Sequence, residues 1–203
     1  MKIFCVGRNY IDHARELNNE VPEEPVIFMK PPTSLLRNAK PFYIPDFSKD
    51  IHFETELIVK IAKNGKHIDR EFVRDYYNEI TVGIDFTARD IQNKLKSKSL
   101  PWELSKGFDF SAAVGIWKEF SAGMKKSDIN FSLNINKNMV QQGKSSDMIF
   151  SIDDLIIYIS RYFKLQAGDL IFTGTPSGVG KVNPGDILEA FIEDELLFYC
   201  EIR

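Results

Sequence analysis

Apolar and polar positions alternate along several short stretches of the chain, and this period of two predicts half-buried β-strands. The clearest stretch is HFETELIVKI, residues 52–61, whose alternation places Glu54 and Glu56 on one face and Leu57 and Val59 on the other. Asn64–Gly65 follows it and predicts a hairpin turn. Further strands are expected at residues 3–6, 26–29, 80–86, 129–135 with a return through Met139, 170–174, 186–192 and 196–202.

Helical spacing of apolar residues appears in only a few places. Residues 9–17 predict a short helix, and 76–78 are expected to close another. A third helix is expected to begin at Thr87 as N-cap, with Asp90 completing a near capping box. The clearest helix covers residues 152–162. Many short strands with few helices predict an α+β, mainly β fold, and 203 residues favour one domain, residues 1–203.

Composition excludes several function classes. Hydrophobic residues make up 43% and the formal net charge is -3, values typical of a folded globular chain. The densest basic run, Lys94, Lys96 and Lys98, is expected to be a solvated helix face, so no nucleic-acid partner is predicted. No apolar run is long enough for a membrane span or a signal peptide, which favours a cytoplasmic protein. Cys5 and Cys200 lie in apolar runs and are expected to be buried reduced thiols.

Three carboxylates form a candidate metal site. Glu54 and Glu56 point the same way because strand side chains alternate, and Asp85 ends an apolar strand where side chains reach a cleft. Oxygen-only ligation suits Mg²⁺, with Mn²⁺ or Ca²⁺ as alternatives. Spacing alone favours a polar solvent-facing strand for the two glutamates and leaves Asp85 open as a cap or turn residue. Arg89 and Asp90 could form a structural pair.

His13 and Glu16 are a second candidate cluster. On a helix they are three residues apart and therefore neighbours, and a carboxylate beside a histidine fixes its tautomer and raises its basicity, as a general base requires. The alternative is an ordinary surface pair. Lys106 would be an exposed lysine by default, but beside a metal it could stabilise an oxyanion or enolate.

The glycine-rich segment TGTPSGVGK, residues 173–181, does not match a phosphate-binding loop. Thr175 stands where that motif has its first glycine, and Val182 replaces its Ser or Thr. A tight loop between strands, with backbone amides near a ligand, fits the segment better.

Six motifs occur in the order found in the fumarylacetoacetate hydrolase family, and the chain resembles the short branch with acylpyruvate hydrolases and oxaloacetate decarboxylases or tautomerases. The motifs are CVGRNYIDHARELN, PVIFMKPPTSLL, HFETELIVKI, TVGIDFTARDIQ, LPWELSKGFD and LIFTGTPSGVG. The resemblance implies a mixed β-sandwich-like roll with a central metal site, assembled as a homodimer. One departure is that Ala112–Ala113 replaces a Cys-Pro common in relatives, which affects local loop shape.

The resemblance also implies roles for single residues. It assigns metal ligation to Glu54, Glu56 and Asp85, a catalytic dyad to His13 and Glu16, and an active-site lysine to Lys106. Substrate binding falls on Gln92 and Thr175, with Arg8 and Asn9 contacting substrate or ordering the dyad loop. Phe108, Phe110 and Ile149 are expected to line the pocket and tune substrate choice.

The implied activity is Mg²⁺-dependent cleavage of a carbon–carbon bond in a small 2-oxo acid or 1,3-dicarbonyl compound. Acylpyruvate hydrolysis and oxaloacetate decarboxylation would both pass through a metal-bound enolate, with the His–Glu dyad activating water for hydrolysis. An isomerase or tautomerase acting on 2-hydroxy-dienedioates or oxaloacetate is the second expectation. A non-catalytic metal-dependent binding protein is the third, and the dyad and the lysine argue against it.

Overall fold

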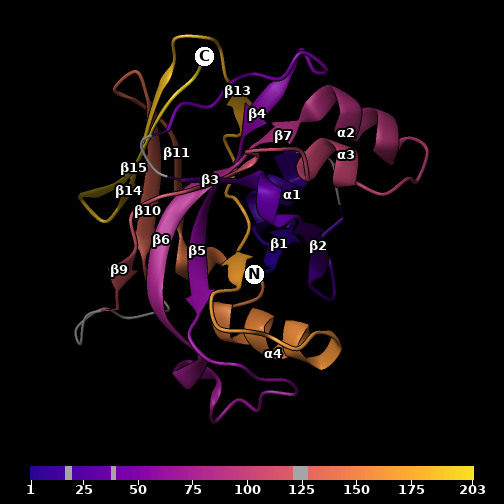
Figure 1. Cartoon of the computed structure of the whole chain (residues 1–203), viewed down its shortest axis with the longest axis vertical. Coiled ribbons are helices and arrows are strands. Elements are labelled where there is room, and N and C mark those ends of the chain that lie inside the picture. Colours follow the sequence, from indigo (N-terminus) through magenta and orange to yellow (C-terminus); the bar gives the residue numbers. More distant parts are fainter. Residues whose placement is uncertain (17–19, 38–39, 121–127) are drawn as a thin grey trace.

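The computed structural model describes residues 1–16, 20–37, 40–120 and 128–203. Its largest element is an eight-stranded mixed sheet with strand order β2-β1-β12-β5-β6-β8-β3, in which β9 pairs with the far end of β6 (Figure 1). Its strands are β1 (Ile3–Gly7), β2 (Val26–Lys30), β3 (Leu35–Arg37), β5 (Thr55–Ile61), β6 (Tyr77–Asp85), β8 (Ala112–Val114), β9 (Lys118–Glu119) and β12 (Leu170–Phe172).

Two smaller sheets complete the β structure. The four-stranded sheet has the order β11-β10-β14-β15, and the three-stranded sheet has the order β13-β4-β7. Their strands are β10 (Asn130–Ile135), β11 (Asn138–Lys144), β14 (Ile187–Ile192), β15 (Glu195–Glu201), β4 (Ile51–Phe53), β7 (Thr87–Ala88) and β13 (Gly180–Lys181). The predicted α+β, mainly β fold is confirmed, and most of the predicted strands lie where the alternation placed them.

The main core lies between the eight-stranded and four-stranded sheets. Leu57 and Val59 of β5 and Val82 of β6 are fully buried there, and Leu133 of β10 and Ala190 of β14 contribute to the same cluster from the opposite sheet. Alternate residues therefore enter this core, as the period of two requires. A smaller apolar cluster, which includes Ile58, covers the other face of the large sheet.

The helices are short. They are α1 (Ile11–Glu16), α2 (Arg89–Lys96), α3 (Glu103–Lys106), α4 (Ile152–Tyr162) and the 3₁₀ turns Pro32–Ser34, Val73–Tyr76 and Ser145–Asp147. The α4 helix has the predicted bounds, and it begins with a capping box in which the Ser151 and Asp154 side chains each accept from the other's backbone N–H. No helix among the described residues has the length and apolarity that crossing a membrane requires.

Three local predictions are wrong. Asn64–Gly65 makes no hairpin, because β5 and β6 are joined by residues 62–76 and Gly65 instead bonds with Leu165. Thr87 does not cap α2; it belongs to β7, and Ala88 occupies the N-cap. The short helix ends at Tyr76, since residues 77–78 already belong to β6. In each case pairing with another segment of the chain overrides a local signal.

Candidate active site and metal centre

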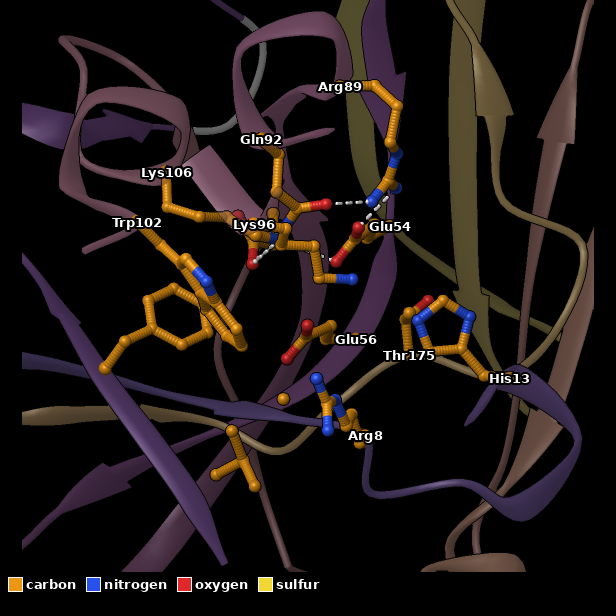
Figure 2. Close-up of a pocket in the computed structure, with 14 residues that line it drawn as sticks. Arg8, His13, Glu54, Glu56, Arg89, Gln92, Lys96, Trp102, Lys106 and Thr175 are labelled. Carbon is orange, nitrogen blue, oxygen red and sulfur yellow. Dashed lines mark hydrogen bonds and ion pairs between the residues drawn. The ribbon is translucent and has the colours of Figure 1, made fainter. Parts of the chain in front are cut away.

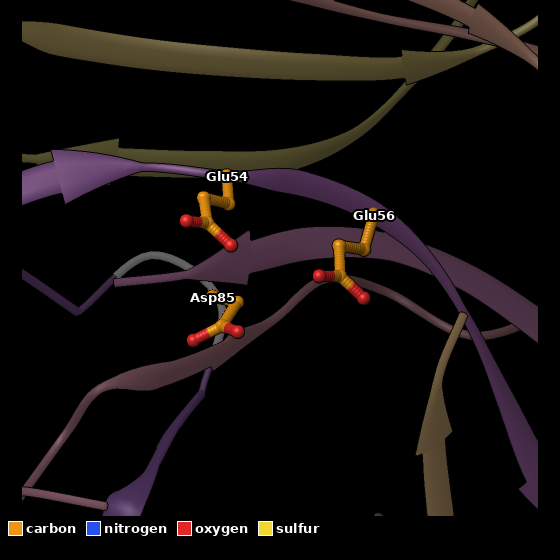
Figure 3. Close-up of side chains that lie close together, drawn as sticks. All are labelled: Glu54, Glu56 and Asp85. Carbon is orange, nitrogen blue, oxygen red and sulfur yellow. The ribbon is translucent and has the colours of Figure 1, made fainter. Parts of the chain in front are cut away.

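The carboxylates of Glu54, Glu56 and Asp85 converge in the interior of the protein (Figure 3). One oxygen from each lies within 4.8 Å of the others, and their exposed fractions are 6%, 2% and 0%. The alternative of a solvent-facing polar strand is therefore wrong for the two glutamates. The cap or turn role is also wrong for Asp85, because α2 has no side-chain cap hydrogen bond.

Strand register brings the three residues together. Glu54 lies at the break between β4 and β5, and Asp85 ends β6, the antiparallel neighbour of β5. Thr55 pairs with Ile84, and the N–H of Asp85 donates to the carbonyl of Glu54 at 2.8 Å. Glu56 follows two residues later on the same face, so both glutamates point toward Asp85.

Three buried cations, Lys30, Arg89 and Lys106, lie beside the carboxylates, and Figure 2 shows Arg89 and Lys106. The Lys106 ammonium lies 2.7 Å from both Glu54 Oε2 and Asp85 Oδ2 and donates its third hydrogen bond to Thr87 Oγ1 at 2.6 Å. Arg89 donates to Glu54 Oε1 at 2.6 Å, and Lys30 Nζ lies 2.6 Å from Asp85 Oδ1. Arg89 thus pairs with Glu54, so the suggested structural pair with Asp90 is wrong. Among the described residues, these three cations pair with Glu54 and Asp85, and none of them pairs with Glu56.

The local charges move the carboxyl pKa values in opposite directions. Burial raises the pKa of Glu54, but Lys106 and Arg89 outweigh it and hold that pKa below its ordinary value. Burial, followed by the neighbouring Asp85 and Glu54, raises the pKa of Glu56 well above its ordinary value. Burial lowers the pKa of Lys106, but Asp85 and Glu54 outweigh it and raise that pKa, so the lysine carries its charge. Of the three carboxyl groups, Glu56 is therefore the one whose negative charge is opposed by burial and by repulsion from Asp85 and Glu54.

The cluster fits a hard divalent cation. The carboxylate of Asp85 is fully buried, with Lys30 Nζ beside Oδ1 and Lys106 Nζ beside Oδ2. Among the described residues, the Glu56 carboxylate accepts one hydrogen bond, from the N–H of Gly174 to Oε2 at 2.7 Å. A divalent ion held by three carboxylates would neutralise their repulsion, and an oxygen-only set selects Mg²⁺, Mn²⁺ or Ca²⁺ over zinc.

His13 and Glu16 of α1 form the predicted pair. His13 Nδ1 lies 3.2 Å from Glu16 Oε2, and His13 is only 5% exposed, so an ordinary surface pair does not describe it. The other Glu16 oxygen accepts from the N–H of Gly178 at 3.0 Å. The glutamate is therefore held from two sides and orients the imidazole at the wall of the pocket, on the side of Thr175 (Figure 2).

The segment after β12 supplies backbone amides, as expected for residues 173–181, and two of them hold acidic residues of the site. Gly174 donates to Glu56 and Gly178 to Glu16. Gly174 has φ +101°, and a Cβ there would lie 2.7 Å from the Asn9 side chain. Only glycine fits this position, because its left-handed backbone and close packing leave no room for a side chain.

The residues expected to bind substrate lie in two environments. Arg8, Gln92 and Thr175 line the same pocket as the carboxylates, and Gln92 Oε1 accepts from Arg89 at 2.5 Å. Arg8 has a left-handed φ of 61°, and its buried Nε has no hydrogen-bond partner among the described residues. Asn9 is fully buried outside the pocket lining; its side chain bonds with Phe150 and the carbonyl of Thr173, which suits ordering of the dyad loop.

Some pocket residues were not predicted. Phe28, Lys96 and Trp102 line the pocket, so Lys96 is not part of a solvated face, and Lys30 and Arg89 hold its carboxylates. One sequence signal could have pointed to Lys30: it lies immediately after an apolar strand and before two prolines. Phe108, Phe110 and Ile149, which were expected here, do not line this pocket: Phe110 is 54% exposed, and the other two border separate hollows.

Known proteins are similar to this chain in fold and in sequence. Residues 2–197 match the family model described as fumarylacetoacetate (FAA) hydrolase, C-terminal. An oxaloacetate decarboxylase, mitochondrial, of Dictyostelium discoideum is 43% identical over 94% of this chain and 88% of its own length. The oxaloacetate tautomerase FAHD1, mitochondrial, of Homo sapiens is 39% identical over 94% of this chain and 86% of its own.

A solved structure extends the comparison to a ligand complex. The fumarylpyruvate hydrolase from Pseudomonas aeruginosa in complex with Mn²⁺ and pyruvate superposes with a TM-score of 0.94 at 32% identity. The match covers 100% of this chain and 89% of that one. Sequence and structure agree over nearly the whole chain, and the protein therefore belongs to the fumarylacetoacetate hydrolase family.

Proposed function

We propose that the protein is a Mg²⁺-dependent enzyme that cleaves a carbon–carbon bond in small 2-oxo acids, by acylpyruvate hydrolysis, oxaloacetate decarboxylation or both. The proposal rests on one observation: three buried carboxylates, the His13–Glu16 pair and Lys106 lie together at one pocket. The relatives support it, since they are named as a decarboxylase, a tautomerase and a hydrolase, and the hydrolase was solved with Mn²⁺ and pyruvate.

Glu54, Glu56 and Asp85 would hold the divalent ion. When bound, the ion acts as a Lewis acid toward the carboxylate and keto oxygens of a 2-oxo acid and favours enolate formation. Arg89 and Lys106 hold Glu54 in position, and Lys30 and Lys106 hold Asp85. Lys106 donates all its hydrogen bonds to protein atoms, so its contribution to an oxyanion requires exchange of one of them for a substrate oxygen.

His13 and Glu16 would serve hydrolysis. With Nδ1 facing Glu16, His13 has Nε2 available to take a proton from water, and the resulting hydroxide attacks the distal carbonyl of an acylpyruvate. The bond between that carbonyl and the adjacent carbon then breaks, releasing a carboxylic acid and the pyruvate enolate, which is protonated to pyruvate. Oxaloacetate gives the same enolate by losing CO₂, without an attacking water.

Tautomerisation of oxaloacetate, or isomerisation of a 2-hydroxy-dienedioate, is the second candidate. It is favoured by the tautomerase relative and would use the same groups to move a proton between carbon and oxygen. It needs an enolate and a proton acceptor but no hydrolytic water, so His13 could serve either chemistry.

A substrate panel with Mg²⁺ distinguishes these activities. Oxaloacetate, acetylpyruvate, fumarylpyruvate and a hydroxy-dienedioate should each be tested, with pyruvate release and tautomerisation followed separately. Pyruvate release from acetylpyruvate or oxaloacetate supports the proposal, and tautomerisation without pyruvate release contradicts it in favour of the second candidate. The homodimer and the cytoplasmic location stay predictions; light scattering tests the first.

A further inference from the structure

Gln141 on β11 connects two parts of the site that lie far apart in the sequence. It is 2% exposed, and its Oε1 accepts from the backbone N–H of Thr55 at 3.0 Å. Its Nε2 donates to Thr175 Oγ1 and to the carbonyl of Pro176, both at 3.0 Å. Thr55 stands between Glu54 and Glu56, so one side chain ties the strand with two carboxylates to the loop bordering the pocket.

The orientation of the Gln141 amide follows from its partners. The backbone N–H of Thr55 can only donate, so the atom that faces it is the carbonyl oxygen. The carbonyl of Pro176 can only accept, so the atom that faces it is the nitrogen. These two contacts independently give the same orientation and prevent the amide from turning over.

This orientation sets the direction of the Thr175 hydroxyl. Because an amide N–H of Gln141 donates to Oγ1, the hydroxyl proton of Thr175 points elsewhere. Among the described residues, it donates to no protein atom. Thr175 is 3% exposed and lines the pocket, with its side chain beside His13 (Figure 2). The proton is therefore available to an oxygen atom inside the pocket.

We propose that Gln141 is a positioning residue that holds the Thr175 hydroxyl as a hydrogen-bond donor to an oxygen of the bound 2-oxo acid. The identity of that ligand rests on the proposed function. The carboxylate and keto oxygens of such an acid accept hydrogen bonds before and during the reaction. An interaction of equal strength in both states changes substrate affinity and not the rate of the chemical step, so it affects KM and leaves kcat unchanged.

The test begins with Gln141→Glu. This change keeps an oxygen for the N–H of Thr55 but replaces the donor to Thr175 and to the Pro176 carbonyl with an acceptor, so the hydroxyl proton of Thr175 turns toward residue 141. We expect the KM for oxaloacetate, and the Kd of the Mn²⁺-loaded protein for pyruvate, to rise about tenfold. The kcat and the affinity for Mn²⁺ alone should stay unchanged.

A double-mutant cycle separates positioning from general support of the fold. Thr175→Val should raise the same KM and Kd about tenfold, and adding Gln141→Glu to it should cause no further rise. Gln142→Glu, at the exposed neighbouring position on β11, is the matched control and should behave as wild type. If Gln141→Glu does not fold, Gln141→Met removes the donor to Thr175 together with the acceptor for the Thr55 N–H; KM and the Kd for pyruvate should rise in it, while the affinity for Mn²⁺ alone stays unchanged.

Multiplicative effects in the double mutant, or a loss of Mn²⁺ affinity in Gln141→Glu, would overturn the inference and show a structural role instead. Normal KM and Kd in Gln141→Glu would also overturn it, while leaving the proposed function intact. A wild-type protein that neither converts oxaloacetate nor binds pyruvate overturns the proposed function and this inference together.

Discussion

Lys30 Nζ lies 2.6 Å from Asp85 Oδ1, and neither side chain is exposed to solvent. A buried ion pair contributes little when both partners are replaced, but removal of one partner leaves an uncompensated charge in the interior. Lys30 also donates to the Ser111 carbonyl and hydroxyl, so it joins the end of β2 to the segment that precedes β8. The lysine is thus a structural support for the metal carboxylates.

Lys30→Met should therefore lower the free energy of unfolding of the metal-free protein by about 3–5 kcal/mol. Lys63→Met is the control, because Lys63 makes a 3.5 Å pair with Asp75 and both side chains are about half exposed or more. That change should cost less than about 1 kcal/mol. Urea unfolding of both variants measures the difference, and equal losses would show that the Lys30 pair has no special role.

Removal of the imidazole should separate the two proposed reactions. His13→Gln should slow acetylpyruvate hydrolysis by about 10²–10⁴-fold, because hydrolysis needs a base for water. Oxaloacetate decarboxylation should be affected less, and Mg²⁺ affinity should stay unchanged, since His13 is outside the carboxylate triad. Steady-state rates with the two substrates measure this. If hydrolysis survives the change, the assignment of the His13–Glu16 pair is wrong.

Arg8 should contribute to binding of the anionic substrate. Its guanidinium lines the pocket, and within the described part of the chain its buried Nε has no hydrogen-bond partner. Arg8→Gln should raise the KM for oxaloacetate by about tenfold or more, because a charge-assisted hydrogen bond is lost, without a change in Mg²⁺ affinity. Arg15→Gln is the control, since Arg15 is on α1 but its side chain is 73% exposed. Equal KM values in both variants would remove Arg8 from the binding site.

Sequence reasoning located the carboxylate triad and the His13–Glu16 pair because each rests on short spacings or on motifs. It also predicted the bounds of α4, because the apolar residues of this helix recur at helical spacing within the segment itself. It missed Lys30 and Gln141 because their partners lie in distant segments; Gln141 and Thr55 are 86 residues apart. The hairpin expected at Asn64–Gly65 failed for the same reason, because Gly65 pairs with Leu165. Contacts between distant segments depend on the fold, which spacing alone does not encode.

The capping box of α4 predicts a dependence of stability on pH. Burial raises the pKa of Asp154, but hydrogen bonds from Ser151 and Arg70 outweigh it and hold that pKa below its ordinary value. Because the pKa of Asp154 is lower in the folded state, its charged form stabilises the protein at pH values above the unfolded-state pKa of about 3.9. This contribution is lost as the pH falls through the folded-state pKa. Asp154→Asn should therefore be less stable than wild type at neutral pH, with the difference shrinking in acid.

Urea unfolding near neutral pH and in acid below the unfolded carboxyl pKa measures this difference. Asp194→Asn, in the exposed turn between β14 and β15, is the control and should match wild type at both pH values. A stability difference for Asp154→Asn that is the same at both pH values would show that its charge does not contribute.

The central claim is that Glu54, Glu56 and Asp85 hold a divalent ion on which turnover of 2-oxo acids depends. Glu56→Gln is the most discriminating variant, because burial and its two acidic neighbours already oppose its charge. The amide oxygen of the replacement can still accept the hydrogen bond from Gly174. This variant should fold at least as stably as wild type without metal, yet bind Mg²⁺ and Mn²⁺ far more weakly.

The most direct measurement is pyruvate release from acetylpyruvate and oxaloacetate by chelator-stripped protein, before and after Mg²⁺ is added back. Wild type should be inactive when stripped and recover fully with Mg²⁺, while folded Glu56→Gln should stay inactive at the same Mg²⁺ concentration. Full activity of stripped wild type, or wild-type Mg²⁺ dependence in Glu56→Gln, would contradict the account.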